Sequence, residues 1–134
     1  MSLKVELKPN ERIIVGAVVI RNGESRARFF IEGNVPILRE KDIITPKMAD
    51  TPAKRIYLSV QIMYLDGIDE EDSKLYFDLM RDFLDAAPSA KPICAEINNR
   101  ILSGELYKAL KVTKDLILYE QKLMAHATST PGVF

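Results

Sequence analysis

The most constraining feature of this sequence is a change in the spacing of its apolar residues, which takes place between residues 39 and 65. Before this stretch, apolar and polar residues alternate and glycine-containing turns recur, as in β-strands. After it, apolar residues return every three or four positions, as in amphipathic α-helices. Within it, Thr51-Pro52 is a helix-start signal, because a threonine side chain caps a helix and proline is tolerated in the first turn. The chain is therefore expected to have a β-rich first part and a helical second part.

The first part is expected to hold about four or five strands, with the clearest patterns at residues 3–7, 13–20, 25–32 and 35–38. Asn22-Gly23 separates the second pattern from the third and is the strongest short hairpin signal, because both residues tolerate a positive φ. We therefore expect these two strands to pair around a two-residue loop. The expected opposite pairs are Arg21 and Glu24, Val19 and Arg26, Ala17 and Arg28, and Val15 and Phe30.

That register gathers basic side chains and one aromatic ring on a single sheet face, at Arg21, Arg26, Arg28 and Phe30. Guanidinium groups pair with phosphates and stack on bases, and an exposed ring offers a stacking platform, so this face suits single-stranded RNA. The alternative is that the arginines only keep the sheet soluble and pair with Glu24 and Glu32.

Further cations follow the last predicted strand, at Arg39 and Lys41, and two more lie at the helix start, Lys54 and Arg55. A strand that runs into Arg39-Glu40 and then isoleucine, after a small antiparallel sheet, is similar to the end of the carbon storage regulator family. In that family the arginine at this place contacts RNA, so the similarity nominates Arg39. The candidate RNA-binding residues are therefore Arg21, Arg26, Arg28, Phe30, Arg39, Lys41, Lys54 and Arg55.

About four helices are predicted in the second part: residues 51–66, a stripe over 75–84 that ends before Pro88, residues 89–103 and residues 105–124. Short connections favour antiparallel neighbours and hence a small bundle. The expected class is α+β, with a small antiparallel sheet or partial barrel followed by this bundle. We expect one domain over residues 1–124, with a β-rich half (1–50) and a helical half (51–124), and a flexible tail over 125–134.

Charge is uneven along the chain, although 19 Lys and Arg balance 19 Asp and Glu. Residues 1–56 hold 11 basic and 7 acidic side chains, residues 57–88 hold 2 and 8, and residues 89–134 hold 6 and 4. Either the basic front half serves a polyanion, or these are ordinary solvated faces. No apolar run approaches the roughly 18 residues needed to span a bilayer, and the first residues lack a signal-peptide core, so we expect a cytoplasmic protein that does not bind membranes.

Residues that carry catalysis or bind metals are scarce. The single Cys94 cannot form an internal disulfide, and with the single His126 it matches no metal-binding spacing. No nucleophile elbow, phosphate-binding loop or dinucleotide-binding glycine motif is present. We therefore expect no enzyme activity, no cofactor and no metal, and a structural role for Cys94 in the core.

Three blocks of the sequence carry a resemblance to a known family: RARFFIEGNVPILREKDII (26–44), DTPAKRIYLSVQIMYL (50–65) and LYKALKVTKDLILYE (106–120). Together with the opening LKVELKPNERIIVGAVVIRNG, they resemble the FlbT family of flagellar regulators of alphaproteobacteria. Two positions depart mildly from the family pattern: Lys54 stands where arginine is expected, and Ser59 where a small apolar residue is usual.

The resemblance implies a post-transcriptional role. FlbT-like proteins associate with the 5′ untranslated region of flagellin mRNA and couple its translation or degradation to flagellar assembly, some as repressors and others as activators. Two hypotheses follow: direct RNA binding through the basic residues, or a chaperone-like adaptor whose helical part senses flagellin or another flagellar regulatory protein. Because the net charge is zero, direct binding is expected to need a partner or a homo-oligomer that joins two basic faces.

Overall fold

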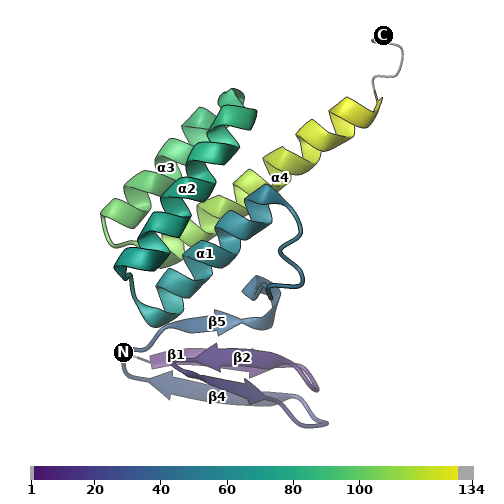
Figure 1. Cartoon of the computed structure of the whole chain (residues 1–134). Coiled ribbons are helices and arrows are strands. Elements are labelled where there is room, and N and C mark those ends of the chain that lie inside the picture. Colours follow the sequence, from purple (N-terminus) through teal and green to yellow (C-terminus); the bar gives the residue numbers. More distant parts are fainter. Residues whose placement is uncertain (1, 130–134) are drawn as a thin grey trace. The chain divides into compact units, whose positions relative to one another are not determined.

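The computed structural model describes residues 2–129 of the chain. The chain divides into two compact units, Met1–Ile43 and Ile44–Phe134. The described part of the first unit contains five β-strands, and that of the second contains four α-helices (Figure 1). The predicted α+β class, with antiparallel strands preceding helices, is confirmed.

The strands of the first unit form two small antiparallel sheets. Their bounds are β1 Ser2–Leu7, β2 Arg12–Val15, β3 Val18–Arg21, β4 Ala27–Glu32 and β5 Ile37–Arg39, followed by a 3-10 turn, η1 Glu40–Asp42. One sheet is the ribbon of β1 and β4, and the other has the strand order β3-β2-β5.

Both sheets contribute to the core of the first unit. Val5 and Leu7 of β1 and Ile13 of β2 are at most 3% exposed. Apolar side chains from both sheets pack against these three residues, namely Val15, Phe29, Ile31 and Ile37. The two-residue period of the strands therefore turns one apolar face of each sheet inward.

The hairpin in this unit lies at Gly16-Ala17, where Val15 and Val18 stand directly opposite each other across β2 and β3. The predicted single strand over 13–20 is therefore wrong, because the chain reverses in its middle. Gly16 has a φ of 62°, and a two-residue loop with glycine first matches the type II′ turn, whose twist suits a hairpin.

The predicted hairpin at Asn22-Gly23 is also wrong, because β4 pairs with β1 and not with β3. The Asn22 side chain instead ties three segments together. Its Nδ2 donates to the carbonyl oxygens of Leu7 at 3.2 Å, Lys8 at 2.8 Å and Ser25 at 2.9 Å. The asparagine thus fixes the connections that flank β1 and β4.

The second unit holds the helices α1 Pro52–Asp66, α2 Glu70–Ala86, α3 Lys91–Leu102 and α4 Leu106–Ser129, with a 3-10 turn, η2 Pro88–Ala90, before α3. Helix α1 packs against α2 and α4, and α4 also packs against α3. Helix α4 projects beyond the other three at its C-terminal end (Figure 1). It continues to Ser129, past the predicted end at Met124, so residues 125–129 of the expected tail are helical; residues 130–134 lie outside the described residues.

The start of α1 agrees with its sequence signal. The Thr51 hydroxyl accepts from the backbone N–H of Lys54 at 3.3 Å, with Pro52 in the first turn. A second oxygen, Oε2 of Glu120 on α4, accepts from the backbone N–H of Ala53 at 2.9 Å. Two of the N–H groups that a helix start leaves unpaired are therefore satisfied by side chains.

Helix α1 also anchors the chain that leads into the second unit. The Gln61 amide donates to the carbonyl oxygen of Ile44 and accepts from its N–H, both at 2.9 Å. Gln61 is buried, so its pairing with one backbone residue satisfies the polar atoms that burial removes from water. No helix in residues 2–129 is long and apolar enough to cross a membrane.

Candidate nucleic-acid interface

The outward side of the β1–β4 ribbon, here called the ribbon face, is the surface where predicted RNA-binding residues meet. It consists of every second residue of each strand, and all of these side chains are exposed: Ser2, Lys4 and Glu6 of β1, and Arg28, Phe30 and Glu32 of β4. Lys4 stands directly opposite Phe30, and Glu6 opposite Arg28. The Phe30 side chain is 60% exposed, which leaves its ring open to a planar ligand.

The two acids of the ribbon face, Glu6 and Glu32, balance its two cations, Lys4 and Arg28. Oε1 of Glu6 lies 3.4 Å from Nζ of Lys4 and 3.5 Å from Nε of Arg28. The side chains of both cations are more than half exposed, so these ion pairs are screened by water and contribute little stability. Arg26 adjoins a shallow hollow that Glu6 and Arg28 also line, and the described residues offer it no ion pair.

Arg21 lies elsewhere, so the prediction that it shares a face with Arg26 and Arg28 is wrong. It ends β3 in the three-stranded sheet and stands opposite Arg12 of β2. Arg12 is bound to Glu40, whose Oε1 is 3.4 Å from its Nε and 3.1 Å from its backbone nitrogen. The physical reason is the turn at Gly16-Ala17, which pairs β3 with β2 in place of β4.

Arg39 and Lys41 do not lie on the ribbon face either. Arg39 is half-buried, and its Nη2 lies 3.5 Å from the carbonyl oxygen of Lys4, so it links β5 to β1. Lys41 is exposed on η1 and borders a separate hollow, which is lined by Lys8, Pro9, Asn10, Glu11, Glu40 and Lys41.

Lys54 and Arg55 belong to the second unit, in the first turn of α1. Nζ of Lys54 lies 3.3 Å from Oδ1 of Asp50, and Arg55 is exposed. One residue of the ribbon face was missed by the sequence reasoning, namely Lys4. Its alternation with Leu3 and Val5 predicted an outward side chain, but only the β1–β4 pairing places it opposite Phe30.

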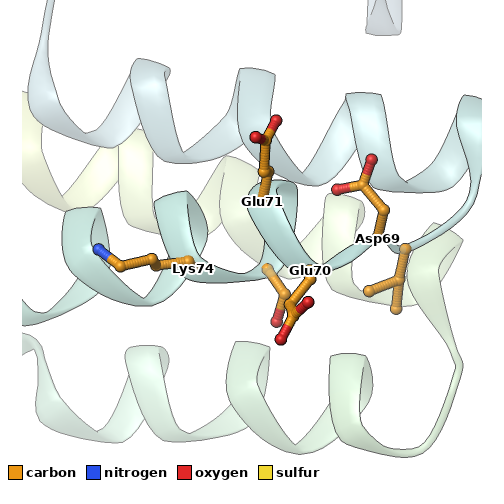
Figure 2. A pocket seen from close by; sticks show the side chains of 6 residues that line it. Asp69, Glu70, Glu71 and Lys74 are labelled. Carbon is orange, nitrogen blue, oxygen red and sulfur yellow. The ribbon is translucent and has the colours of Figure 1, made fainter.

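A hollow in the second unit has the opposite character. It lies at the start of α2 and is lined by Ile68, Asp69, Glu70, Glu71, Ser73 and Lys74 (Figure 2). Oδ1 of Asp69 accepts from the backbone N–H of Asp72 at 2.7 Å and so caps the helix. Desolvation and the neighbouring Asp69 raise the pKa of the Asp72 carboxyl. Since three carboxylates line this hollow, it repels phosphate and does not suit RNA.

The buried titratable groups of the second unit serve packing. Cys94 is fully buried, which raises the pKa of its thiol to about 11, so it is not a thiolate at neutral pH. The buried Tyr76 donates to Oδ1 of Asn98 at 2.6 Å, and burial raises the pKa of its hydroxyl. Within residues 2–129, no group of three or more His, Cys, Asp or Glu side chains is placed to hold a metal ion.

These features define a small α+β protein in two units, with an exposed sheet face that presents an aromatic ring next to two cations. Comparison with known proteins adds the family. The chain belongs to the FlbT family, because the family model described as "Flagellar protein FlbT" matches residues 3–124.

Several curated relatives align over nearly the whole chain. A protein of Bradyrhizobium diazoefficiens named "Probable flagellum biosynthesis repressor protein FlbT 1" is 55% identical over 97% of this chain and 90% of its own length. A "Probable flagellum biosynthesis repressor protein FlbT" of Rhodopseudomonas palustris is 47% identical, over 93% of this chain and 99% of its own. The "Flagellum biosynthesis repressor protein FlbT" of Caulobacter vibrioides is 34% identical, over 96% and 94%. No solved structure matches the chain.

Proposed function

We propose that this chain regulates flagellum biosynthesis after transcription, by binding the 5′ untranslated region of flagellin mRNA and controlling its translation or degradation. The names of its relatives support a repressing role in flagellum biosynthesis. The observation that carries RNA binding is the exposed ring of Phe30, which has two outward-facing cations as neighbours on one sheet face: Lys4 directly across the ribbon and Arg28 two residues away along β4.

The ribbon face has the parts that a single-stranded RNA surface needs. A base stacked on an aromatic side chain contributes about 1–3 kcal/mol, and any base can stack because each has a π-face. Lys4 and Arg28 flank the ring and can exchange their weak pairing with Glu6 for a phosphate. Because Glu6 opposes the phosphate, the affinity of one copy is modest and falls with salt.

The test is a binding titration of flagellin leader RNA at several salt concentrations. For single strands, the logarithm of the binding constant falls with the logarithm of salt by about 0.7 per phosphate contact. Arg28→Gln is expected to reduce that slope by about 0.7, because one contact is lost. Phe30→Ala is expected to weaken binding by about tenfold and leave the slope unchanged, since stacking releases no counterion.

Matched substitutions on α2 provide the control. Arg81 and Phe77 are an exposed arginine and an exposed phenylalanine that belong to the second unit, so Arg81→Gln and Phe77→Ala make the same chemical changes without altering a residue of the ribbon face. They are expected to leave both affinity and slope unchanged. If the ribbon-face variants behaved like this pair, or if the pure protein bound no RNA at low salt, direct recognition through this face would be rejected.

A second function is favoured by a specific feature of α2. Leu75 is 51% exposed on a helix whose first turn carries Glu70, Glu71 and Asp72, so it can serve as an apolar anchor beside an acidic surface for a docked protein. In this alternative, the chain is an adaptor that senses flagellin or another flagellar regulatory protein, and its effect on mRNA is indirect. Capture of unassembled flagellin that survives nuclease treatment and is abolished by Leu75→Asp would support the adaptor.

A further inference from the structure

Strand β3 is an unprotected sheet edge. It is an outer strand of the three-stranded sheet, and all four of its residues are exposed. Val18, Val19 and Ile20 are 57%, 61% and 40% exposed. Natural proteins protect edges with charges, proline or very short strands, because a bare edge pairs with other chains. Three consecutive aliphatic residues on β3 have neither charge nor proline, and the only charge of the strand is Arg21 at its end.

The other strands show that protection. On β4 the outward positions include the charged Arg28 and Glu32. Strand β5 has only three residues and is preceded by Pro36. The bare edge is therefore a particular property of β3 within the first unit.

The backbone groups of β3 that point away from β2 can be identified from the register. Asn22 lies opposite Glu11, and its N–H donates to the Glu11 carbonyl oxygen at 2.8 Å. Because hydrogen-bonded and non-bonded pairs alternate in antiparallel strands, Ile20 and Val18 also bond to β2. The N–H and C=O groups of Val19 and Arg21 therefore point outward, to the free edge.

We infer that β3 pairs antiparallel with β3 of a second copy, about a twofold axis, so that the two three-stranded sheets become one sheet of six strands. In the register that satisfies every outward group, Val19 lies opposite Arg21 of the partner subunit, and Ile20 faces Ile20 of the partner subunit. Each Arg21 then opposes a valine, so no like charges stand directly opposite each other across the new strand pair.

A second copy fits this edge better than an unrelated strand does. The edge is complementary to itself under a twofold axis. The outward backbone groups of Val19 bond to those of Arg21 in the other copy, and the Ile20 side chains of the two copies face each other. The pairing also places Arg12 and Arg21 of both copies on one sheet face, because directly opposite residues share a face. The clustered charge limits the strength of the dimer.

The small area of the proposed interface also indicates a weak dimer. A pair of four-residue strands buries less than the roughly 1,200 Å² that stable complexes need. The dimer is therefore weak and depends on protein concentration, and it needs no RNA.

Cross-linking tests the register. Residues that face each other in a non-hydrogen-bonded antiparallel pair have Cα atoms about 4.5 Å apart, which suits a disulfide. Ile20→Cys is therefore expected to yield a covalent dimer under mild oxidation. Cys94 is fully buried and does not compete. Leu102→Cys, at a 75% exposed position of α3, is the control for random collision. If Ile20→Cys formed no more dimer than this control, the proposed register would be overturned.

Sedimentation and amide exchange test the pairing itself. Val19→Pro removes an N–H that points to the free edge, so it leaves the ladder with β2 intact and is expected to abolish the dimer. In the unsubstituted chain, the amides of Val19 and Arg21 should exchange more slowly as concentration rises, while those of Val18 and Ile20 are protected throughout. A chain that stays monomeric up to millimolar concentration, or Val19→Pro that dimerises as the parent does, would refute the proposal.

Discussion

The Ser59 hydroxyl on α1 is a buried polar group without a hydrogen-bond partner among the described residues. Burying such a group without a bond costs about 1–3 kcal/mol. We predict that Ser59→Ala leaves the free energy of unfolding unchanged or raises it by about 1 kcal/mol, as measured by urea denaturation.

Thr113→Ala is the matched control for Ser59→Ala. The Thr113 hydroxyl is also buried on a helix, but it donates to the Ala109 carbonyl oxygen at 2.7 Å. Its loss removes a hydrogen bond and a methyl group, so we expect a decrease of about 1–2 kcal/mol. A comparable decrease in Ser59→Ala would mean that the Ser59 hydroxyl is satisfied.

For single residues of the ribbon face, part of the candidate site was predictable from the sequence. Arg28 and Phe30 are two positions apart in a strand, so they share a face whichever strand pairs with theirs. The placement of Arg21 depended on a particular hairpin and was wrong. The period of a strand is a local property, whereas the pairing of strands is decided by the whole sheet.

Among the elements, the β2–β3 hairpin depends on one backbone conformation. Gly16 has a φ of 62°, which an L-residue with a side chain adopts at a cost of roughly 1–2 kcal/mol. We predict that Gly16→Ala lowers the free energy of unfolding by about that amount, as measured by thermal or urea denaturation. The space beside Gly16 is adequate, since the nearest atoms to an added Cβ belong to Val35 at 3.8 Å.

Gly23→Ala is the control for Gly16→Ala, because it makes the same replacement at a glycine that does not have a positive φ. A Cβ at Gly23 would meet no atom within 4 Å. Its substitution should therefore leave stability nearly unchanged or raise it slightly, because alanine restricts the unfolded chain. Equal losses at the two glycines would contradict the assignment of the turn to residues 16 and 17.

The same element explains why the strand pairing was mispredicted. Asn22-Gly23 has the composition of a hairpin loop, whereas the actual loop is hidden in the apolar run Val15-Gly16-Ala17-Val18. The amide of Asn22 serves contacts with residues distant in sequence, which composition does not reveal. The start of α1 was predictable because a cap and a first-turn proline act within a few residues.

For the whole molecule, alkaline pH should destabilise the second unit through Cys94 and Tyr76. Burial raises the pKa of Cys94 from 9.0 to about 11, and it also raises that of Tyr76 above its ordinary 10.0. The folded state therefore holds these protons more tightly than the unfolded state. The stabilisation is complete below about pH 9 and is lost as pH rises towards 11, by about 1.4 kcal/mol per pH unit from Cys94.

Denaturation followed by helical circular dichroism at a series of pH values measures this dependence. Cys94→Ala has no thiol to ionise, so it should be less stable at neutral pH yet show a shallower loss between pH 9 and 10. Equal slopes in the two proteins would contradict a raised pKa for Cys94.

The bond between Glu120 and Ala53 sets an order of events when the chain is made. The carboxylate that completes the first turn of α1 lies 67 residues downstream of the N–H it accepts from. At synthesis rates of about 5–20 residues per second, that partner is added roughly 3–13 s after Ala53. During this interval the start of α1 has only the local cap from Thr51. A ribosome that pauses before residue 120 therefore carries a nascent chain in which the backbone N–H of Ala53 still lacks its carboxylate partner.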